Sequence, residues 1–213
     1  MAERTLTSAD IVTVLNKLAD DLESHTEELR QLDAVIGDGD LGITTALCSK
    51  AIREYFAAAS ESNIGSLLAK CGLSINKASP STFGTLLTSA FLGAGKMVTG
   101  KESIDSNDLV QMAEGAVDGI KKRGKAELGD KTMLDCIAPA ADAFRKQIEG
   151  GSDLKKALEA AISAADRGVK ATVQMMSKHG RASWHRENTI GVQDAGATAM
   201  YYILESFARH LPK

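Results

Sequence analysis

The sequence predicts an all-α fold, a barrel or bundle of about eight antiparallel amphipathic helices, formed as a single domain over residues 1–213. Apolar residues recur at the i, i+3, i+4, i+7 spacing of one helical face along most of the chain, and alternation with a period of two is nearly absent. Breaks of Gly, Ser, Asp or Pro separate these segments, and no Pro-rich or Ser-rich linker divides the chain. Aromatic residues make up only 4% of the chain, while Ala and Gly are frequent on the apolar faces, so we expect the helices to approach one another closely.

The first predicted helix has its apolar stripe between Ile11 and Leu22, with Thr7 and Ser8 as candidate N-caps. We expect this helix to run into the loop of residues 33–42. Further helices are predicted over residues 43–56, 64–75, 86–97, 109–120 with Ser106 as the N-cap, 133–148, 154–169 and 197–207.

The loop of residues 33–42 carries the clearest functional signal. Asp33, Asp38 and Asp40 are interleaved with glycines, whose backbone can turn sharply and approach a ligand closely. Mg²⁺ prefers oxygen ligands, is held by a few carboxylates, and completes its shell with water and phosphate oxygens. The three carboxylates are therefore candidate magnesium ligands in a site that handles phosphate.

Two other interpretations of this loop are an ordinary turn and an EF-hand. Asp and Gly are common in ordinary turns, where the Asp side chain accepts hydrogen bonds from nearby backbone amides. An EF-hand would need a Glu six residues after its glycine, and no register of the loop supplies one. The helix predicted directly after the loop favours the metal site, because its free amides and its dipole would attract an anion.

Three further segments are polar or rich in glycine. Residues 77–85 have the hydroxyls and the Gly of an anion-binding turn, and a helix-capping connector explains them equally well. Residues 121–133 are charged, and we expect them to form a solvated loop between two helices. Residues 95–101 match half of a P-loop, but Glu102 replaces the required hydroxyl and no strand precedes them, which excludes a P-loop.

Composition bounds the partners and the compartment. Charged residues make up 25% of the chain, its formal net charge is −3, and it has no long basic cluster, which argues against nucleic acid or a membrane as partner. The N-terminus lacks the layout of a signal peptide and no apolar run could span a membrane, so we expect a cytoplasmic protein. The three separated cysteines predict buried thiols, without a disulfide framework or a zinc site. His179 and His185 lack metal-ligand spacing, and we expect them to be solvated.

Six short motifs, taken together, resemble the nucleotide-binding L subunit of bacterial dihydroxyacetone kinase, and the resemblance covers essentially the whole chain. Each motif alone is weak, but their order and separations agree with that family throughout. They are Asp33-x₄-Asp38-Gly-Asp40, Ala78-Ser79 to Phe83-Gly84-Thr85, Arg123-Gly124-Lys125-Ala126-Glu127, Gly129-Asp130-Lys131-Thr132-Met133, Gly180-Arg181-Ala182-Ser183 and Gln193-Asp194-Ala195-Gly196-Ala197.

The resemblance implies a helical barrel with ADP or ATP bound at one end through two Mg²⁺ ions, which Asp33, Asp38 and Asp40 would hold. It also implies a set of nucleotide-binding positions. These are Leu41, Gly42 and Thr44 after the metal loop, Ser79 and Pro80 near the phosphates, Gly124 and Met133 on the adenine side, and Arg181, Asp194 and Gly196 closing the pocket.

The chain departs from the family pattern at the start of the helix after the metal loop. Leu41 and Thr44 stand where the family usually has His and Asn, and Val192 replaces a second His. The alkyl side chain of Leu41 cannot make the contact of an imidazole with phosphate. We therefore expect weaker nucleotide retention than in relatives with His and Asn, which favours an exchangeable ATP donor.

The resemblance implies the phosphoryl-transfer subunit of a kinase for dihydroxyacetone or a similar short ketose such as a tetrulose, with the sugar held by a separate K subunit. No protein nucleophile is required, because phosphoryl transfer depends mainly on positioning and charge neutralisation. A second interpretation has the nucleotide rephosphorylated by a phosphocarrier protein of the sugar phosphotransferase system. A third is a regulatory module that binds ADP and docks a transcription factor without catalysis.

Overall fold

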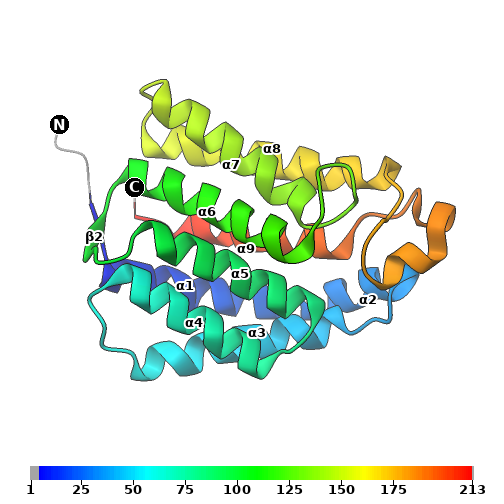
Figure 1. Cartoon of the computed structure of the whole chain (residues 1–213), viewed down its shortest axis with the longest axis horizontal. Coiled ribbons are helices and arrows are strands. Elements are labelled where there is room, and N and C mark those ends of the chain that lie inside the picture. Colours follow the sequence, from blue (N-terminus) through cyan, green and yellow to red (C-terminus); the bar gives the residue numbers. More distant parts are fainter. Residues whose placement is uncertain (1–4, 213) are drawn as a thin grey trace.

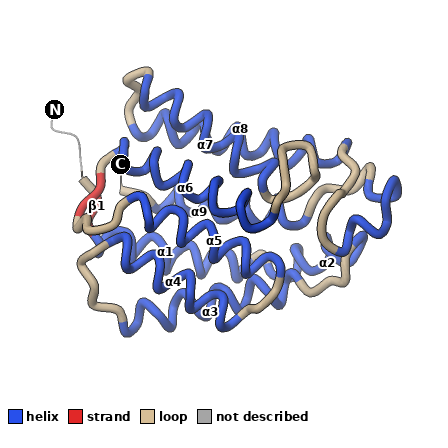
Figure 2. The backbone as a smooth tube through the Cα atoms, in the orientation of Figure 1, coloured by secondary structure: helices blue, strands red, loops and turns tan. Residues whose placement is uncertain are grey.

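The computed structural model describes residues 5–212, which are mainly α-helical (Figure 1, Figure 2). Two short strands, β1 (Leu6–Thr7) and β2 (Ser103–Ile104), pair antiparallel. The expected lack of a signal peptide rests partly on residues 1–4, which lie outside the described residues. The α-helices are α1 (Ser8–Ser24), α2 (Thr26–Ile36), α3 (Leu41–Ala58), α4 (Ile64–Ala78), α5 (Thr82–Met97), α6 (Ser106–Gly124), α7 (Leu134–Glu149), α8 (Leu154–Ala171) and α9 (Ala195–His210), and the 3₁₀-helices are η1 (Thr172–Gln174) and η2 (Arg181–Thr189).

The longer α-helices form a closed ring. Each packs against the next in the order α1, α3, α4, α5, α6, α7, α8 and α9, and α9 packs against α1. The shorter helix α2 lies at one end of the ring, in contact with α3, α9 and η2 (Figure 1). The prediction of an all-α barrel of about eight antiparallel helices is confirmed.

The apolar stripes read from the sequence are the buried faces of these helices. In α1 the buried residues include Ile11, Val14, Leu18 and Leu22, which lie on one face at helical spacing. Thr7 is the N-cap of α1 and forms a capping box with Asp10, as one of the two expected caps. The equivalent prediction for α6 is off by one residue, because Asp105 is the N-cap and Ser106 is the first helical residue.

Small residues allow the close helix packing that the composition predicts. A Cβ atom added at Gly93 in α5 would lie only 2.0 Å from the carbonyl oxygen of Gly115 in α6. The reverse substitution at Gly115 would place a Cβ atom 2.5 Å from the carbonyl oxygen of Gly93. The backbones of α5 and α6 are therefore in contact at this crossing, and any larger side chain would force them apart.

The barrel interior is apolar and incompletely filled. Side chains from seven of the helices line a cavity of about 190 Å³, with Leu18, Leu68, Phe91 and Phe144 among them. No helix in residues 5–212 is long and apolar enough to cross a membrane. The apolar side chains thus face the interior of the ring and leave its polar groups to the two ends and the outer surface.

Two boundaries differ from the sequence prediction. The first helix does not run into the metal loop, because α1 ends at Ser24 and a separate helix, α2, leads to the loop. His25 joins the two helices with φ −96° and ψ 5°, and its backbone N–H still donates to the carbonyls at the end of α1. Helix α3 starts at Leu41, two residues before the predicted start, because Asp40 already serves as its N-cap residue.

Neighbouring helices alternate in direction, so four connections meet at one end of the barrel (Figure 1). These are residues 25–40, which include α2, and residues 79–81, 125–133 and 172–194. We call this the site end, because the residues expected to bind metal and nucleotide lie on these connections or within a turn of them. The β1–β2 pair and the connections 59–63, 98–105 and 150–153 lie at the opposite end.

Candidate metal centre

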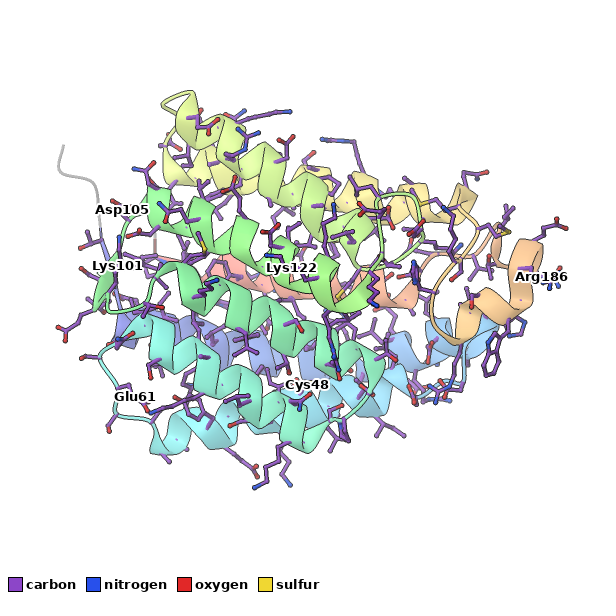
Figure 3. The ribbon with its side chains drawn as sticks, viewed as in Figure 1. Cys48, Glu61, Lys101, Asp105, Lys122 and Arg186 are labelled. Carbon is purple, nitrogen blue, oxygen red and sulfur yellow. The ribbon has the colours of Figure 1, made fainter. Side chains whose placement is uncertain are left out.

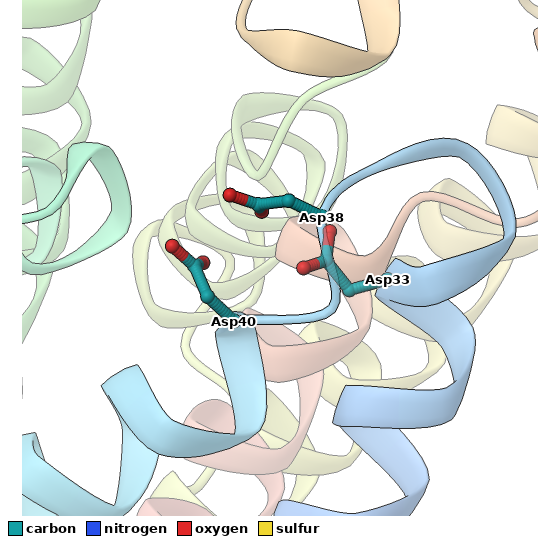
Figure 4. A group of neighbouring side chains, drawn as sticks. All are labelled: Asp33, Asp38 and Asp40. Carbon is teal, nitrogen blue, oxygen red and sulfur yellow. The ribbon is translucent and has the colours of Figure 1, made fainter.

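Three carboxylates gather at the site end, as the sequence predicts. Asp33 lies in the last turn of α2, Asp38 lies in the following loop, and Asp40 is the N-cap residue of α3 (Figure 4). One ligand oxygen from each residue lies within 4.8 Å of the other two. The backbone N–H of Leu41 donates to Asp33 Oδ2 over 3.2 Å and fixes the carboxylate of the helix against the loop.

The backbone of the loop explains why glycines separate these carboxylates. Gly39 has φ +72°, a left-handed conformation that side chains disfavour. At Gly37 a Cβ atom would lie 2.2 Å from Asp33 Oδ1, so a side chain there would displace a candidate ligand. The glycines thus allow the turn and leave room for the carboxylate group.

The electrostatics of the cluster favour a bound cation. Burial raises the pKa of Asp33 above its ordinary value, and the negative charges of Asp38 and Asp40 raise it further. A divalent cation between the three groups would reverse this repulsion. Oxygens around one Mg²⁺ lie about 3 to 4 Å apart, and paired catalytic metals about 3.5–4 Å apart, so the observed spacing fits such ions with small side-chain adjustments.

Arg181 reaches the cluster from a distant part of the chain. It begins η2, and its Nη1 atom lies 2.7 Å from Asp38 Oδ2 and 3.4 Å from Asp40 Oδ2. The side chain is 58% exposed, so it can turn from the carboxylates toward an anion beside them. This position is consistent with the expectation that Arg181 closes the nucleotide pocket.

The first turn of α3 places backbone amides beside the carboxylates. A Cβ atom at Gly42 would lie 2.3 Å from the carbonyl oxygen of Thr26, so this glycine is required for α3 to pack against α2. Leu41 and Thr44 are both buried, and Leu41 packs within the hydrophobic core. The alkyl group at position 41 therefore has a packing role, which an imidazole could not fill without a polar partner.

Asp194 stands at the start of α9, close enough to Asp33 for the two negative charges to interact. It is the N-cap of α9, and its Oδ1 accepts a hydrogen bond from the N–H of Ala197 over 2.6 Å. Asp194 is half-buried, and desolvation of its carboxyl group raises its pKa to about 6, although the charge of Lys131 acts in the opposite direction. Gly196 follows in the first turn of α9, half-buried.

The remaining predicted positions are near the site end but are not bonded to the carboxylates. Within residues 5–212, no hydrogen bond or ion pair joins them to the three Asp side chains. Ser79 is buried beside the thiol of Cys48 in α3, Pro80 is exposed, Gly124 ends α6, and Met133 is buried in the core before α7. Figure 3 labels Cys48 on α3.

The segment of residues 77–85 caps two helices. Ser79 is the C-cap residue of α4, and Ser81 is the N-cap of α5, where its side chain accepts from the N–H of Gly84. The helix-capping interpretation is therefore confirmed for this segment. A role in binding phosphate stays a prediction.

The expectation of a solvated loop over residues 121–133 is wrong at both ends of this range, since residues 121–124 are the last turn of α6 and not a loop. Asp130 and Lys131 are buried, at 8% and 1% exposure. The carboxylate of Asp130 accepts from Lys178 Nζ over 2.6 Å and lies 3.1 Å from His179 Nε2, so His179 is not freely solvated either. The hydrogen bond from Lys178 holds the pKa of Asp130 well below its usual range.

The sequence interpretation also gave no role to Asp135. This residue is buried in the first turn of α7, where it accepts hydrogen bonds from the N–H groups of Gly129 and Thr132. The sequence does contain a local pattern that could have identified Asp135, because Thr132 and Asp135 have the spacing of a helix-start motif. No local signal marks Lys131, whose contacts lie more than forty residues away.

The fold is a helical barrel with a cluster of three carboxylates at one end. Residues 35–209 match the DAK2 domain, and the chain belongs to this family. It is 32% identical over 204 residues to the PEP-dependent dihydroxyacetone kinase, ADP-binding subunit DhaL, of Escherichia coli (strain K12), covering 96% of this chain and 97% of that protein.

Two further similarities extend this result. The chain is 29% identical over 217 residues to the ADP-binding subunit DhaL of PEP-dependent dihydroxyacetone kinase 2 of Listeria innocua, covering 100% of this chain and 99% of that protein. Its fold resembles the crystal structure of the dihydroxyacetone kinase from C. freundii in complex with AMP-PNP and Mg²⁺, with a TM-score of 0.73 and 24% identity. That match covers 97% of this chain but only 35% of the C. freundii kinase chain.

Proposed function

We propose that this chain is the nucleotide-binding, phosphoryl-transfer subunit of a kinase that acts on dihydroxyacetone or a related short ketose such as a tetrulose. A separate substrate-binding K subunit would hold the sugar. The names of the E. coli and Listeria relatives, both ADP-binding subunits, support this proposal. Similarity to a D-erythrulose kinase of Mycolicibacterium smegmatis, 30% identical over 192 residues, supports extending the substrate class to four-carbon ketoses.

The observation that carries the proposal is the carboxylate cluster at the N-terminus of α3. Asp33, Asp38 and Asp40 would hold Mg²⁺, in two ions, which would neutralise the charge of the nucleotide phosphates. The C. freundii kinase structure with AMP-PNP and Mg²⁺ supports this assignment for the family fold. The free amides of the first turn of α3 point along the helix axis toward the same place and favour an anion there.

Other side chains at the site end would orient the nucleotide. Arg181 lies close enough to Asp38 and Asp40 to bind a phosphate oxygen beside them. Asp194 and Gly196 at the start of α9 would close the pocket, Ser79 and Pro80 would contact phosphate, and Gly124 and Met133 would line the adenine side. Gly42 would contribute its backbone amide, whereas Leu41 and Thr44, whose N–H groups already donate to Asp33 Oδ2 and to the carbonyl of Asp40, would line the site.

The phosphoryl donor is either free ATP or a phosphocarrier protein that rephosphorylates bound ADP. The E. coli and Listeria relatives are named as PEP-dependent, which favours the phosphocarrier. Leu41 stands where the family usually has His, and the loss of the contact between an imidazole and phosphate favours an exchangeable ATP. Extensive dialysis followed by nucleotide analysis separates these two modes. Stoichiometric ADP after dialysis would support the phosphocarrier, and its loss would support ATP.

The proposed function is tested by calorimetry and by reconstitution. Titration of ADP should give binding with Mg²⁺ and none in EDTA, and equal affinity in chelator would contradict the metal assignment. The chain alone should not phosphorylate dihydroxyacetone, and addition of a cognate K subunit with ATP or a phosphocarrier system should start turnover. Nucleotide binding without turnover under either donor would instead support the ADP-binding regulatory module.

A further inference from the structure

Lys131 is the largest of the fully buried side chains in residues 5–212, with 1% exposure. Its ammonium nitrogen lies within hydrogen-bond distance of four backbone carbonyl oxygens. A buried ammonium is costly unless its hydrogen bonds are satisfied, so this arrangement needs a structural reason. The four acceptors are Thr172 at 2.9 Å, Met175 at 3.1 Å, Thr189 at 2.6 Å and Val192 at 2.5 Å.

These four carbonyls belong to the two sides of one loop. Thr172 and Met175 lie where the chain leaves α8, and Thr189 and Val192 lie where it returns toward α9. We call residues 172–175 and 189–192 the neck of the loop. Two further hydrogen bonds cross this neck, from Gly191 N to Val173 O and from Ser177 N to Thr189 Oγ1.

The outer part of the loop beyond the neck is largely exposed, although Lys178 and His179 contact Asp130 and η2 contacts α2. Arg181, Trp184 and Arg186 are exposed, with Trp184 at 81% exposure, and Figure 3 shows Arg186 on the outer side of η2. Arg186 has φ +48° and ψ −123°, a conformation that side chains disfavour, whereas the φ of +65° at Gly180 is readily adopted by glycine. The position of the loop therefore depends on its neck together with the contacts of Lys178 and His179 with Asp130.

We propose that Lys131 is a positioning residue that closes the neck and thereby fixes Arg181 over Asp38 and Asp40. This inference rests on the proposed function, in which Arg181 contacts the nucleotide phosphates. An ammonium supplies three N–H donors that can be shared among four carbonyl oxygens, and no neutral side chain of this shape can do so. Asp130, the preceding residue, supports the same loop through Lys178 and His179.

The charges around the ammonium are consistent with this role. Burial lowers the pKa of Lys131, and the negative charge of Asp194 opposes that shift. Asp194 itself joins the neck, because its N–H donates to Thr172 Oγ1 over 3.0 Å. Lys131 thus holds the neck directly, and Thr172 links the neck to the start of α9.

The test compares Lys131→Met with Lys101→Met. The control also removes an ammonium from a buried acceptor, because Lys101 Nζ lies 2.5 Å from Asp108 Oδ1 at the opposite end. Trp184 is the one tryptophan of the chain and lies in the loop, so its fluorescence anisotropy reports loop motion. We expect Lys131→Met to add a fast component to the anisotropy decay and to weaken Mg²⁺–ADP binding about tenfold or more, while Lys101→Met changes neither.

A double-mutant cycle shows whether Lys131 acts through Arg181. In an Arg181→Met background, Lys131→Met should weaken ADP binding no further, because the contact that it positions is already absent. Fully additive losses would overturn the proposal. Loss of the helical circular dichroism in Lys131→Met would also overturn it, since the residue would then serve the barrel as a whole.

Chemical rescue provides an independent measurement. In Lys131→Ala, added propylammonium matches the missing atoms and should restore the slow anisotropy decay, whereas tetramethylammonium at equal concentration has no N–H donor and should not. Equal effects of the two cations would contradict the proposal. The anisotropy needs no nucleotide, so failure of the wild-type protein to bind Mg²⁺–ADP would refute the proposed function while leaving this test of the neck intact.

Discussion

The two ends of the barrel use polar residues in different ways. At the opposite end, Thr7 with Asp10 and Asp105 with Asp108 form capping boxes, and each partner lies three residues away in the sequence. At the site end, Arg181 contacts Asp40 across 141 positions, and Lys131 contacts Val192 across 61. Local pairs mainly stabilise helices, whereas long-range pairs hold a particular spatial arrangement of charges.

The ends also differ in electrostatic strain. The caps at the opposite end match a carboxylate or hydroxyl with free backbone amides, which is favourable in the folded protein. The site end places three carboxylates within 4.8 Å and half-buries a fourth, that of Asp194. Such an arrangement opposes folding and favours cation binding, as expected where function rather than stability determines the residues.

The largest effect is expected for a substitution in the carboxylate cluster, which should weaken nucleotide binding without lowering the stability of the fold. Asp40→Asn removes a charged ligand while keeping the size of the side chain. We expect Mg²⁺-dependent ADP affinity to fall at least about a hundredfold, because loss of a ligand exceeds the loss of a supporting contact. The free energy of unfolding without metal should not fall, because like-charge repulsion is relieved.

Calorimetry and chemical denaturation in EDTA measure the two quantities for Asp40→Asn. Asp38→Asn should behave in the same way. Asp166→Asn is a matched control, since that carboxylate pairs with Lys170 on the surface of α8. A variant that binds Mg²⁺–ADP as the wild type does would remove that carboxylate from the metal site.

The next effect concerns pH and the carboxyl group of Asp194. Its folded-state pKa of about 6 exceeds the ordinary value, so the folded protein binds a proton that the unfolded chain releases between about pH 4 and 6. The contribution of Asp194 to stability is therefore greatest below pH 4 and declines as the pH rises through 6. Asp194→Asn removes this decline and can still accept from the N–H of Ala197.

We expect Asp194→Asn to stabilise the metal-free protein at pH 7 by on the order of 2 kcal/mol relative to its effect at pH 4. Denaturant unfolding of both proteins in EDTA from pH 4 to 7.5 measures this difference. Asp33 is present in both proteins, so the comparison reports the titration of Asp194 together with its charge coupling to Asp33. A difference that does not vary with pH would show that the carboxyl group of Asp194 is not strained.

The contrast between the ends explains what the sequence predicts well. Apolar spacing and caps depend on residues within one or two turns, so the barrel helices and the Thr7 cap follow from local patterns. The loop with Asp33, Asp38 and Asp40 is also local, and its carboxylates come together as predicted. The break at His25 was missed because the apolar face continues from α1 into α2 without a Gly or Pro.

The remainder depends on contacts that no local pattern contains. Lys131 lies in a segment of charged residues, where the ordinary expectation is solvent exposure, and only the return of residues 172–192 buries it. His179 and Asp130 are likewise brought together over 49 positions. The nucleotide-binding roles of Ser79 and Gly124 stay predictions from the resemblance, because the structure supports their location at the site end but not a contact.

A smaller effect is expected at the opposite end. Thr7→Ala removes the side-chain acceptor for the N–H of Asp10 and half of the capping box of α1. The loss should be about 1 kcal/mol in the free energy of unfolding, with no change in Mg²⁺–ADP affinity. Thermal or urea unfolding together with calorimetry checks both. Altered nucleotide affinity would show that the two ends are energetically coupled through α1.

The smallest effect tests whether position at the site end is sufficient for function. Lys170 lies in the last turn of α8, close in sequence to the neck, and its Nζ atom is 2.7 Å from Asp166 Oδ2. Both side chains are exposed, at 69% and 41%, so the pair should contribute less than about 0.5 kcal/mol to stability. We expect Lys170→Ala to leave Mg²⁺–ADP affinity unchanged within twofold at 0.15 M salt, because exposed charges beyond about 8 Å are screened. Titrations at low and physiological salt check this. If Lys170→Ala weakened Mg²⁺–ADP binding at both salt concentrations, the overall charge of the site end would attract the nucleotide. Binding would then not depend on particular charged contacts such as those of Arg181, and the contrast between the two ends would be wrong.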